Sequence, residues 1–251
     1  MWLYPASAFA SDDIEADWTA VAPTVAARSA VPIPFTGAEL AALVGSKPIA
    51  RRFDTPDGAF AVGAVWVAAP IEDLWVVLQD AMHDAASPGP SRLTQRRLTA
   101  GVGPEQTKQV YMHLDLPYPL TDRQWVVVVS TNAPLYQATG GQVWQRRWVL
   151  GDPASAGPPG SATGPDPDAT WLPDTRGAWT LLESHGGTVV QFSVRTVLGG
   201  LVPSSIAQGW AVSTVRGALE RVAARATSLP GHYDAAHEVV YAPDGAPIPP
   251  R

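Results

Sequence analysis

The chain has 251 residues, of which 46% are hydrophobic and 16% charged, a composition typical of a globular protein with one large domain or two small ones. Its formal net charge of −6 argues against nucleic acid as a partner, because proteins that bind nucleic acid neutralise phosphates with clustered Lys and Arg. The absence of cysteine excludes disulfides, thiol nucleophiles and thiolate metal sites. The sequence has no run of about 18 apolar residues, so no transmembrane segment is expected.

Residues 1–46 are predicted to form a helical segment that packs on the rest of the chain. Apolar residues recur at helical spacing from Asp12 to Ser29, and Thr36 with Glu39 has the pattern of a capping box for a short second helix. Ala8-Phe9-Ala10 has the pattern of a signal-peptidase site, although the preceding residues lack the basic and apolar regions of a signal peptide. The compartment therefore stays open: these residues form an irregular arm of a soluble, cytoplasmic protein, or the end of a signal that directs a periplasmic or secreted protein.

The middle of the chain is predicted to be mainly β-strand. A hairpin over 49–68 turns at Thr55-Pro-Asp-Gly58, because Pro presets one backbone dihedral and Gly supplies a positive φ. A helix is expected from Ile71 to about Leu78, after Pro70. Four strands, near 93–100, 107–116, 123–131 and 142–150, then have the spacing of an antiparallel meander.

The last third of the chain combines an insertion, two strands, a long helix and a tail. Residues 151–168 are rich in Gly, Pro and Ala, and we expect a flexible insertion because they bury too little apolar surface to repay ordering. Strands are expected at 178–183 and 188–198, and the longest helix runs from Pro203 to about Thr227. The tail, 229–251, is expected to lie extended on the surface or to fray.

Two motifs carry a resemblance to a known family. The first is the strand, proline-containing turn and strand in Tyr111-Met-His-Leu-Asp-Leu-Pro-Tyr-Pro-Leu-Thr-Asp-Arg-Gln-Trp-Val-Val-Val-Val-Ser130, and the second is Gly199-Gly-Leu-Val-Pro203, between a strand and the final helix. With this order of elements, residues 47–228 resemble a START domain of the helix-grip (START-like, polyketide cyclase-type) superfamily. Gln124 stands where the family has an acidic residue, so no role is assigned to a carboxylate there.

The resemblance implies an α+β helix-grip fold, in which a curved antiparallel sheet wraps around a long C-terminal helix and encloses an apolar cavity. It also implies that the domain binds one lipid or sterol. Our own reading of Arg123 is structural, since an arginine at the start of a strand can donate to loop carbonyls or pair with Asp122 or Asp115.

Strand alternation and the alanine-rich stripe of the final helix select the residues that would line this cavity. We expect a large cavity that is nearly free of charge, in which Thr196, Thr214 and indole N–H groups are the polar partners. The candidate ligand-binding residues are Val110, Met112, Leu114, Trp125, Val127, Val129, Trp144, Trp148, Phe192, Val194, Thr196, Ala207, Ala211, Thr214, Val215 and Ala218.

The segment Leu198, Gly199, Gly200 and Leu201 is a candidate gate for ligand entry, because two adjacent glycines restrain the backbone least. Its leucines would allow transient contact with a membrane. The alternative is that the glycines only form the turn between strand and helix.

The primary hypothesis is a monomeric, non-enzymatic carrier of one hydrophobic ligand, a sterol or another lipid, that needs no cofactor and no metal. The five histidines form no metal-ligand spacing or nucleophile motif, and no phosphate-binding loop is present. A second hypothesis is an aromatase/cyclase of polyketide assembly, which is similar in fold and would need two or more polar or titratable groups that face inward. A third is a regulatory module that senses a ligand and acts through a stable partner.

Overall fold

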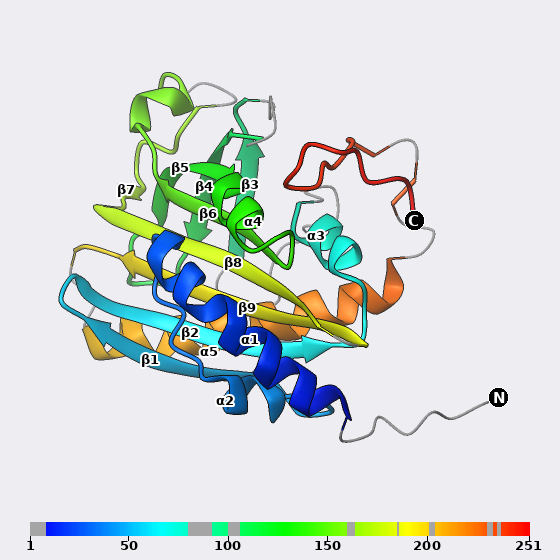
Figure 1. Ribbon diagram of the computed structural model, residues 1–251. Helices are drawn as coiled ribbons and strands as arrows, with labels where there is room; N and C mark the ends of the chain where they lie inside the picture. Colours follow the sequence, from blue (N-terminus) through cyan, green and yellow to red (C-terminus); the bar gives the residue numbers. More distant parts are fainter. Residues whose placement is uncertain are drawn as a thin grey trace.

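The computed structural model describes residues 9–79, 92–99, 106–159, 164–184, 186–200, 204–229, 233–234 and 237–251. It contains one curved sheet with helices on both faces (Figure 1). The strands are β1 (Ile49–Thr55), β2 (Gly58–Val67), β3 (Arg92–Arg97), β4 (Lys108–Asp115), β5 (Arg123–Thr131), β6 (Val143–Leu150), β7 (Thr170–Trp171), β8 (Asp174–Ser184) and β9 (Gly187–Val197). The helices are α1 (Phe9–Arg28), α2 (Gly37–Ala41), α3 (Ile71–Gln79), α4 (Ala133–Ala138) and α5 (Ser204–Ser228), with a 3-10 turn, η2, at Pro153–Ala156.

The sheet has the strand order β1-β2-β9-β8-β6-β5-β4-β3, and neighbouring strands on this path are antiparallel. The short strand β7 pairs in parallel with β5. The predicted hairpin is confirmed, with Thr55 paired to Gly58 at the turn, and so is the meander from β3 to β6. Three elements, α4, η2 and β7, have no counterpart among the predicted ones.

The outer face of the sheet is covered by α1 and α2. The apolar stripe of α1, which includes Ile14 and Trp18, is buried against Val62 and Val189 of the sheet. Below it, the side-chain amide of Gln145 on β6 donates to Ser29 Oγ and Thr180 Oγ1, each at 2.9 Å. These bonds satisfy polar groups that would otherwise be buried without partners, so they fix the position of the helix on the sheet. The capping box of Thr36 and Glu39 is also formed.

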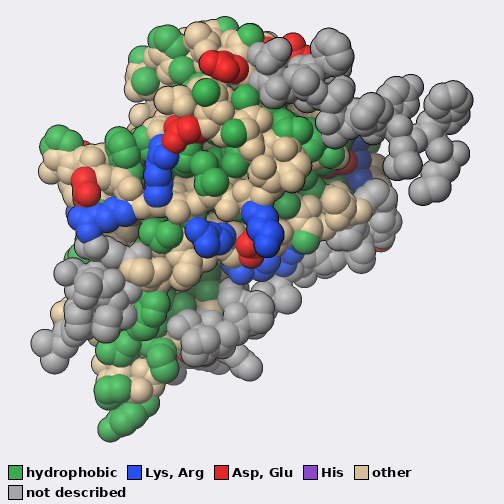
Figure 2. Space-filling view, turned by 90° about the horizontal axis from the view of Figure 1, so that it is seen from below, with side chains coloured by type: hydrophobic (Ala, Val, Ile, Leu, Met, Phe, Trp, Pro, Cys, Tyr) green, Lys and Arg blue, Asp and Glu red, His purple; other side chains and the backbone are tan. Residues whose placement is uncertain are grey.

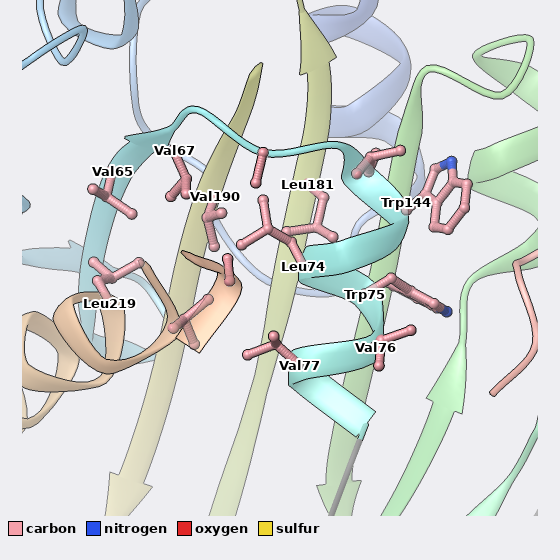
Figure 3. Packing of buried hydrophobic residues seen from close by; sticks show 14 of the residues in the cluster. Val65, Val67, Leu74, Trp75, Val76, Val77, Trp144, Leu181, Val190 and Leu219 are labelled. Atoms are coloured by element: carbon pink, nitrogen blue, oxygen red, sulfur yellow. The ribbon is translucent and has the colours of Figure 1, made fainter. Parts of the chain in front are cut away.

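The inner face of the sheet packs against α5 and α3. Gly63 on β2 allows α5 to approach, because a Cβ there would lie 2.6 Å from Val215 and 2.8 Å from Leu219. The resulting core joins strands, α3 and α5 (Figure 3), and its labelled members include Val65, Val67, Val190, Leu181, Leu219, Leu74 and Val77. Trp75 of α3 meets Trp144 of β6 edge to face, with ring centroids 5.4 Å apart.

The C-terminal tail differs from its prediction. It lies beside α3 (Figure 1), and Tyr233, Val240 and Ile248 are buried in the same core as α5. The carbonyl of Tyr241 accepts hydrogen bonds from Trp75 Nε1 at 2.9 Å and from Gln106 Nε2 at 2.8 Å. The expectation of a surface tail is therefore wrong for these residues, because their apolar side chains find a partner surface on α3.

The Gly- and Pro-rich insertion is also more ordered than its composition indicates. Ala156 in η2 is buried beneath Tyr111 and Val126 on the outer face of the sheet. The side-chain amide of Gln124 donates to the carbonyls of Asp166 at 2.8 Å and Ala169 at 2.9 Å. The expected flexibility is contradicted for these parts of the insertion, whereas residues 160–163 lie outside the described ranges.

At the N-terminus, Phe9 and Ala10 already belong to α1, although the sequence predicted an irregular arm or a signal end there. Met1 to Ala8 lie outside the described residues. Asp12, where the sequence pattern of this helix begins, thus lies inside the helix, three residues after its start.

Candidate functional site

An apolar surface covers the inner face of β4, β5 and β6 beyond the part packed under α5. We call it the inner apolar face. Trp125 and Val127 at its centre are buried, as is Leu172, which packs on them, whereas the other side chains around them are only partly buried. Its members are Val110, Met112, Leu114, Trp125, Val127, Val129, Trp148 and Leu150, packed with Leu93, Leu172 and Leu198.

Strand register explains why these residues share one surface. Val110 pairs with Val127, which pairs with Leu150, and Val129 pairs with Trp148. Because side chains opposite one another in antiparallel strands point to the same face, the predicted alternation of these strands is confirmed.

Trp148 joins this surface to the core under α5. It pairs with Gly177 on β8, where a Cβ would lie 2.1 Å from the indole. The missing side chain lets the indole lie across β8 toward Phe192, with ring centroids 5.8 Å apart. Phe192 in turn stacks on Trp179 at 3.9 Å. A continuous aromatic surface therefore runs from β6 to β9.

The remaining candidate ligand residues do not lie together. Some are in the core, some are on the surface, and the side chain of one lies outside the described residues. Trp144, Phe192, Val215 and Ala218 are buried in the core with α5, and Val194 and Ala211 pack against it. Thr214 on α5 and Thr196 on β9 are exposed, and the Thr196 hydroxyl lies 3.1 Å from that of Thr175. The side chain of Ala207 lies outside the described part.

The expectation of a face nearly free of charge is wrong. Lys108 pairs with Val129, and Arg146 pairs with Thr131 and lies between Trp144 and Trp148, so both cations share the inner face. The pKa of Lys108 is lowered to about 8. Burial is the largest cause, and the positive charges of the neighbouring Arg146 and Arg97 add to it. Burial alone lowers the pKa of Arg146 to about 10.

Alternation along β6 contained the signal for Arg146, because residues 144, 146 and 148 must point to one face. Arg146 was nevertheless not among the candidate ligand residues. Arg146 is 4% exposed and donates to Thr131 Oγ1 at 2.8 Å and to the carbonyl of Gln106 at 2.9 Å.

The candidate gate is held by Arg123, whose predicted structural role is confirmed. Arg123 is 3% exposed and donates to the carbonyls of Leu198 at 2.7 Å and Gly199 at 3.2 Å. It also donates to the carbonyls of Thr121 and Asp122 in the β4–β5 loop. Gly199 and Gly200 have φ of 66° and 65°, which glycine adopts readily, and Leu201 lies outside the described residues.

A separate polar group lies on the outer face of β4. His113 is close to three carboxylates: its Nδ1 lies 3.0 Å from Asp115, and its Nε2 lies 3.4 Å from Asp166 and 3.9 Å from Asp122. His113, Asp115 and Asp122 each offer a ligand atom, all within 4.8 Å of one another, which is a spacing that fits a divalent cation. His113 and Asp115 are two residues apart on β4, whereas Asp122 and Asp166 come from separate loops.

A cavity of about 290 Å³ opens at the ends of β2 and β9, and it is separate from the inner apolar face. It is lined by Ala68, Ala69, Pro70, Ile71, Glu183, Ser184, Gly186 and Gly187, a set that includes no candidate ligand residue.

Seen from below, the surface mixes Lys and Arg side chains with Asp, Glu and hydrophobic ones (Figure 2). Among the described helices, none has the length and apolar character needed to cross a membrane.

Comparison of structures identifies the fold. A STAR-related lipid transfer protein from Xanthomonas axonopodis is similar, with a TM-score of 0.52 and 20% identity, over 72% of this chain and 92% of that one. Human STARD10 gives a TM-score of 0.52 at 12% identity, over 68% and 64% of the two chains. The lipid transfer and protein localization domain of human StarD13 gives 0.52 at 11% identity, over 72% and 84%. No protein-family model and no curated protein matches the sequence. The chain therefore has the α+β helix-grip fold of START domains, with a curved antiparallel sheet and a long C-terminal helix.

Proposed function

We propose that the chain binds one hydrophobic small molecule per monomer, a sterol or another lipid, between the inner apolar face and α5, and carries it unchanged. The supporting observation is a contrast in burial along the inner side of the sheet. Val65, Val190 and Leu219 are buried where the sheet packs against α5, whereas Met112 and Val129 on the inner apolar face are only half buried. An incompletely covered apolar surface inside a fold provides the contact area that a ligand needs.

Such a surface is large enough to bind a ligand without many polar contacts. A sterol-sized ligand that buries about 400 Å² of apolar surface gains roughly 10 kcal/mol before entropic costs. The aromatic surface of Trp148 and Phe192 would contribute flat area that suits fused rings. Two of the similar structures carry lipid transfer in their names, which supports the same class of ligand.

Ligand entry is assigned to the gate, residues 198–201, with transient contact to a membrane. Arg123 joins this segment to the β4–β5 loop, which carries Tyr118 with 97% of its surface exposed. An exposed aromatic residue between two prolines can insert at a membrane surface while the gate opens.

Native mass spectrometry combined with organic extraction tests the proposal. We expect one lipid per chain in the purified protein, or saturable binding of a fluorescent sterol in competition with a fluorescent fatty acid. A protein that carries no lipid and binds neither probe would contradict the carrier function.

A cyclase-type enzyme is the second candidate, and one observation favours it. Lys108 and Arg146 are two titratable groups on the inner face, the arrangement that a cyclase needs to steer a bound polyketide chain. Incubation with a linear poly-β-ketone thioester tests this function. A cyclase would give one dominant ring product that is lost in Lys108→Met, whereas a carrier would leave the spontaneous product mixture unchanged.

A further inference from the structure

Three cationic side chains meet at one corner of the inner apolar face. Arg97 on β3 pairs with Val110, and Lys108 on β4 pairs with Val129, so both cations stand next to apolar members of that face. Arg146 on β6 stands on the other side of β5, opposite Thr131. The apolar face thus ends at a group of cations contributed by three strands.

Hydrogen bonds bring the head of Arg146 toward Lys108. Its Nη1 reaches Thr131 on the neighbouring strand, and its Nη2 reaches the carbonyl of Gln106, two residues before Lys108. The side chain of Lys108 is itself 15% exposed. Burying cations together is unfavourable, and an anion placed among them lowers that cost.

A carboxylate from the C-terminal tail already lies at this corner. Glu238 forms an ion pair with Arg97 and lies 3.7 Å from Lys108 Nζ. The tail on either side is anchored, since Tyr233 and Val240 are buried in the core. Glu238 is nevertheless 47% exposed, so its carboxylate can be displaced without moving the buried residues.

We propose that Arg97, Lys108 and Arg146 form a binding site for the carboxylate of an amphiphilic ligand, and that Glu238 occupies this site when no such ligand is bound. This inference rests on the proposed binding function and makes the ligand class more specific. The apolar body of the ligand would lie on Val110, Val129 and Trp148, with its acidic end at Lys108. Long-chain or polycyclic carboxylic acids have this shape and charge.

Binding of matched probes tests the assignment. Palmitic acid, hexadecanol and hexadecyl phosphate share an apolar chain and differ only in the head group, and their affinities are measured by displacement of a fluorescent probe at pH 7. We expect the acid to bind about tenfold more tightly than the alcohol, since a charge-assisted contact is worth roughly one such factor. Tighter binding of hexadecyl phosphate than of the acid would overturn the carboxylate assignment in favour of a phosphate head group.

Two variants separate the roles of the site residues. Lys108→Met should reduce the acid-to-alcohol ratio to near one, because it removes the cation that the acid alone contacts. Glu238→Gln should raise acid affinity severalfold, because the internal competitor has lost its charge. Arg195→Gln removes an ion pair with Asp174 elsewhere in the sheet and should leave the ratio unchanged.

The outcomes distinguish this inference from the proposed function. If neither these probes nor a fluorescent sterol binds to the wild-type protein, the binding function itself fails. If acid and alcohol bind equally, or if Lys108→Met keeps the acid preference, the carboxylate site is wrong while the binding function stands. If Glu238→Gln lowers acid affinity, the competition by the tail is wrong.

Discussion

The Nε of Arg123 donates to the carbonyl of Leu198 at 2.7 Å, although the two residues are 75 positions apart in the sequence. This bond ties the start of β5 to the end of β9, and a second bond from the same guanidinium reaches Gly199. One buried side chain therefore holds both the β4–β5 loop and the segment before α5.

Replacing Arg123 by Met should destabilise the protein by about 3 kcal/mol, because carbonyls that now accept from a cation would lose their partner. Urea denaturation measures the change. Arg123→Lys should recover part of the loss, since it restores one donor group. Arg195→Gln, which removes an ion pair with partly exposed partners, should cost less than about 1 kcal/mol. A fully stable Arg123→Met variant would exclude this role.

The double variant Gly199→Ala, Gly200→Ala tests the gate. Both residues have φ near 65°, so each alanine should cost about 1 to 2 kcal/mol. If the segment is the gate, ligand transfer between vesicles should slow more than equilibrium binding weakens. Gly209→Ala in α5, where a Cβ has open space, is the control and should leave transfer unchanged. If the folded double variant transfers ligand as fast as the wild-type protein, the two glycines serve only to form the turn between strand and helix.

Ala211→Phe tests whether α5 borders the ligand. Ala211 is half buried at the edge of the core, one turn before Val215. We expect the ring to occupy ligand space, so that binding of a fluorescent sterol is lost while the urea midpoint is kept. Ala224→Phe, at an exposed position of the same helix, is the control. A loss of about 1 to 3 kcal/mol with intact binding would mean that Ala211 faces packed core.

Lys108 should make stability depend on pH in the alkaline range. Its pKa is about 8 in the folded protein and 10.5 in the unfolded chain, so the unfolded chain binds more protons between these values. The free energy of unfolding should therefore rise from pH 8 to 10.5 relative to Lys108→Met, by at most about 3 kcal/mol. The exposed Lys47→Met serves as control. A constant difference between wild type and Lys108→Met would show that Lys108 titrates normally.

Much of the fold was predictable from residues that lie close together in the sequence. The turn at Gly58 and the cap at Thr36 depend on residues within a few positions, and both form as expected. The docking of the tail was not predictable in this way, because Tyr241 is held by Trp75 and Gln106, which are far away in the sequence.

The apolar part of the candidate site was predictable because a strand alternates strictly between its two faces. Val110, Met112 and Leu114 lie together as expected. The cations of the site were missed because their closeness depends on the strand order of the sheet, which brings β3, β4 and β6 to one corner. Glu238 adds a contact from the tail that no local pattern indicates.

Because α1 and α2 cover the outer face, the sheet has two parts whose backbone amides should exchange with deuterium in different ways. Strands β2, β8 and β9 lie between α1 on one side and the core under α5 on the other, so their amides should exchange with deuterium only through global unfolding. Strand β3 ends the sheet, pairs on one side with β4, and carries partly exposed side chains. Its amides should exchange by local opening, and a bound ligand on the neighbouring β4 should slow that exchange without affecting β2.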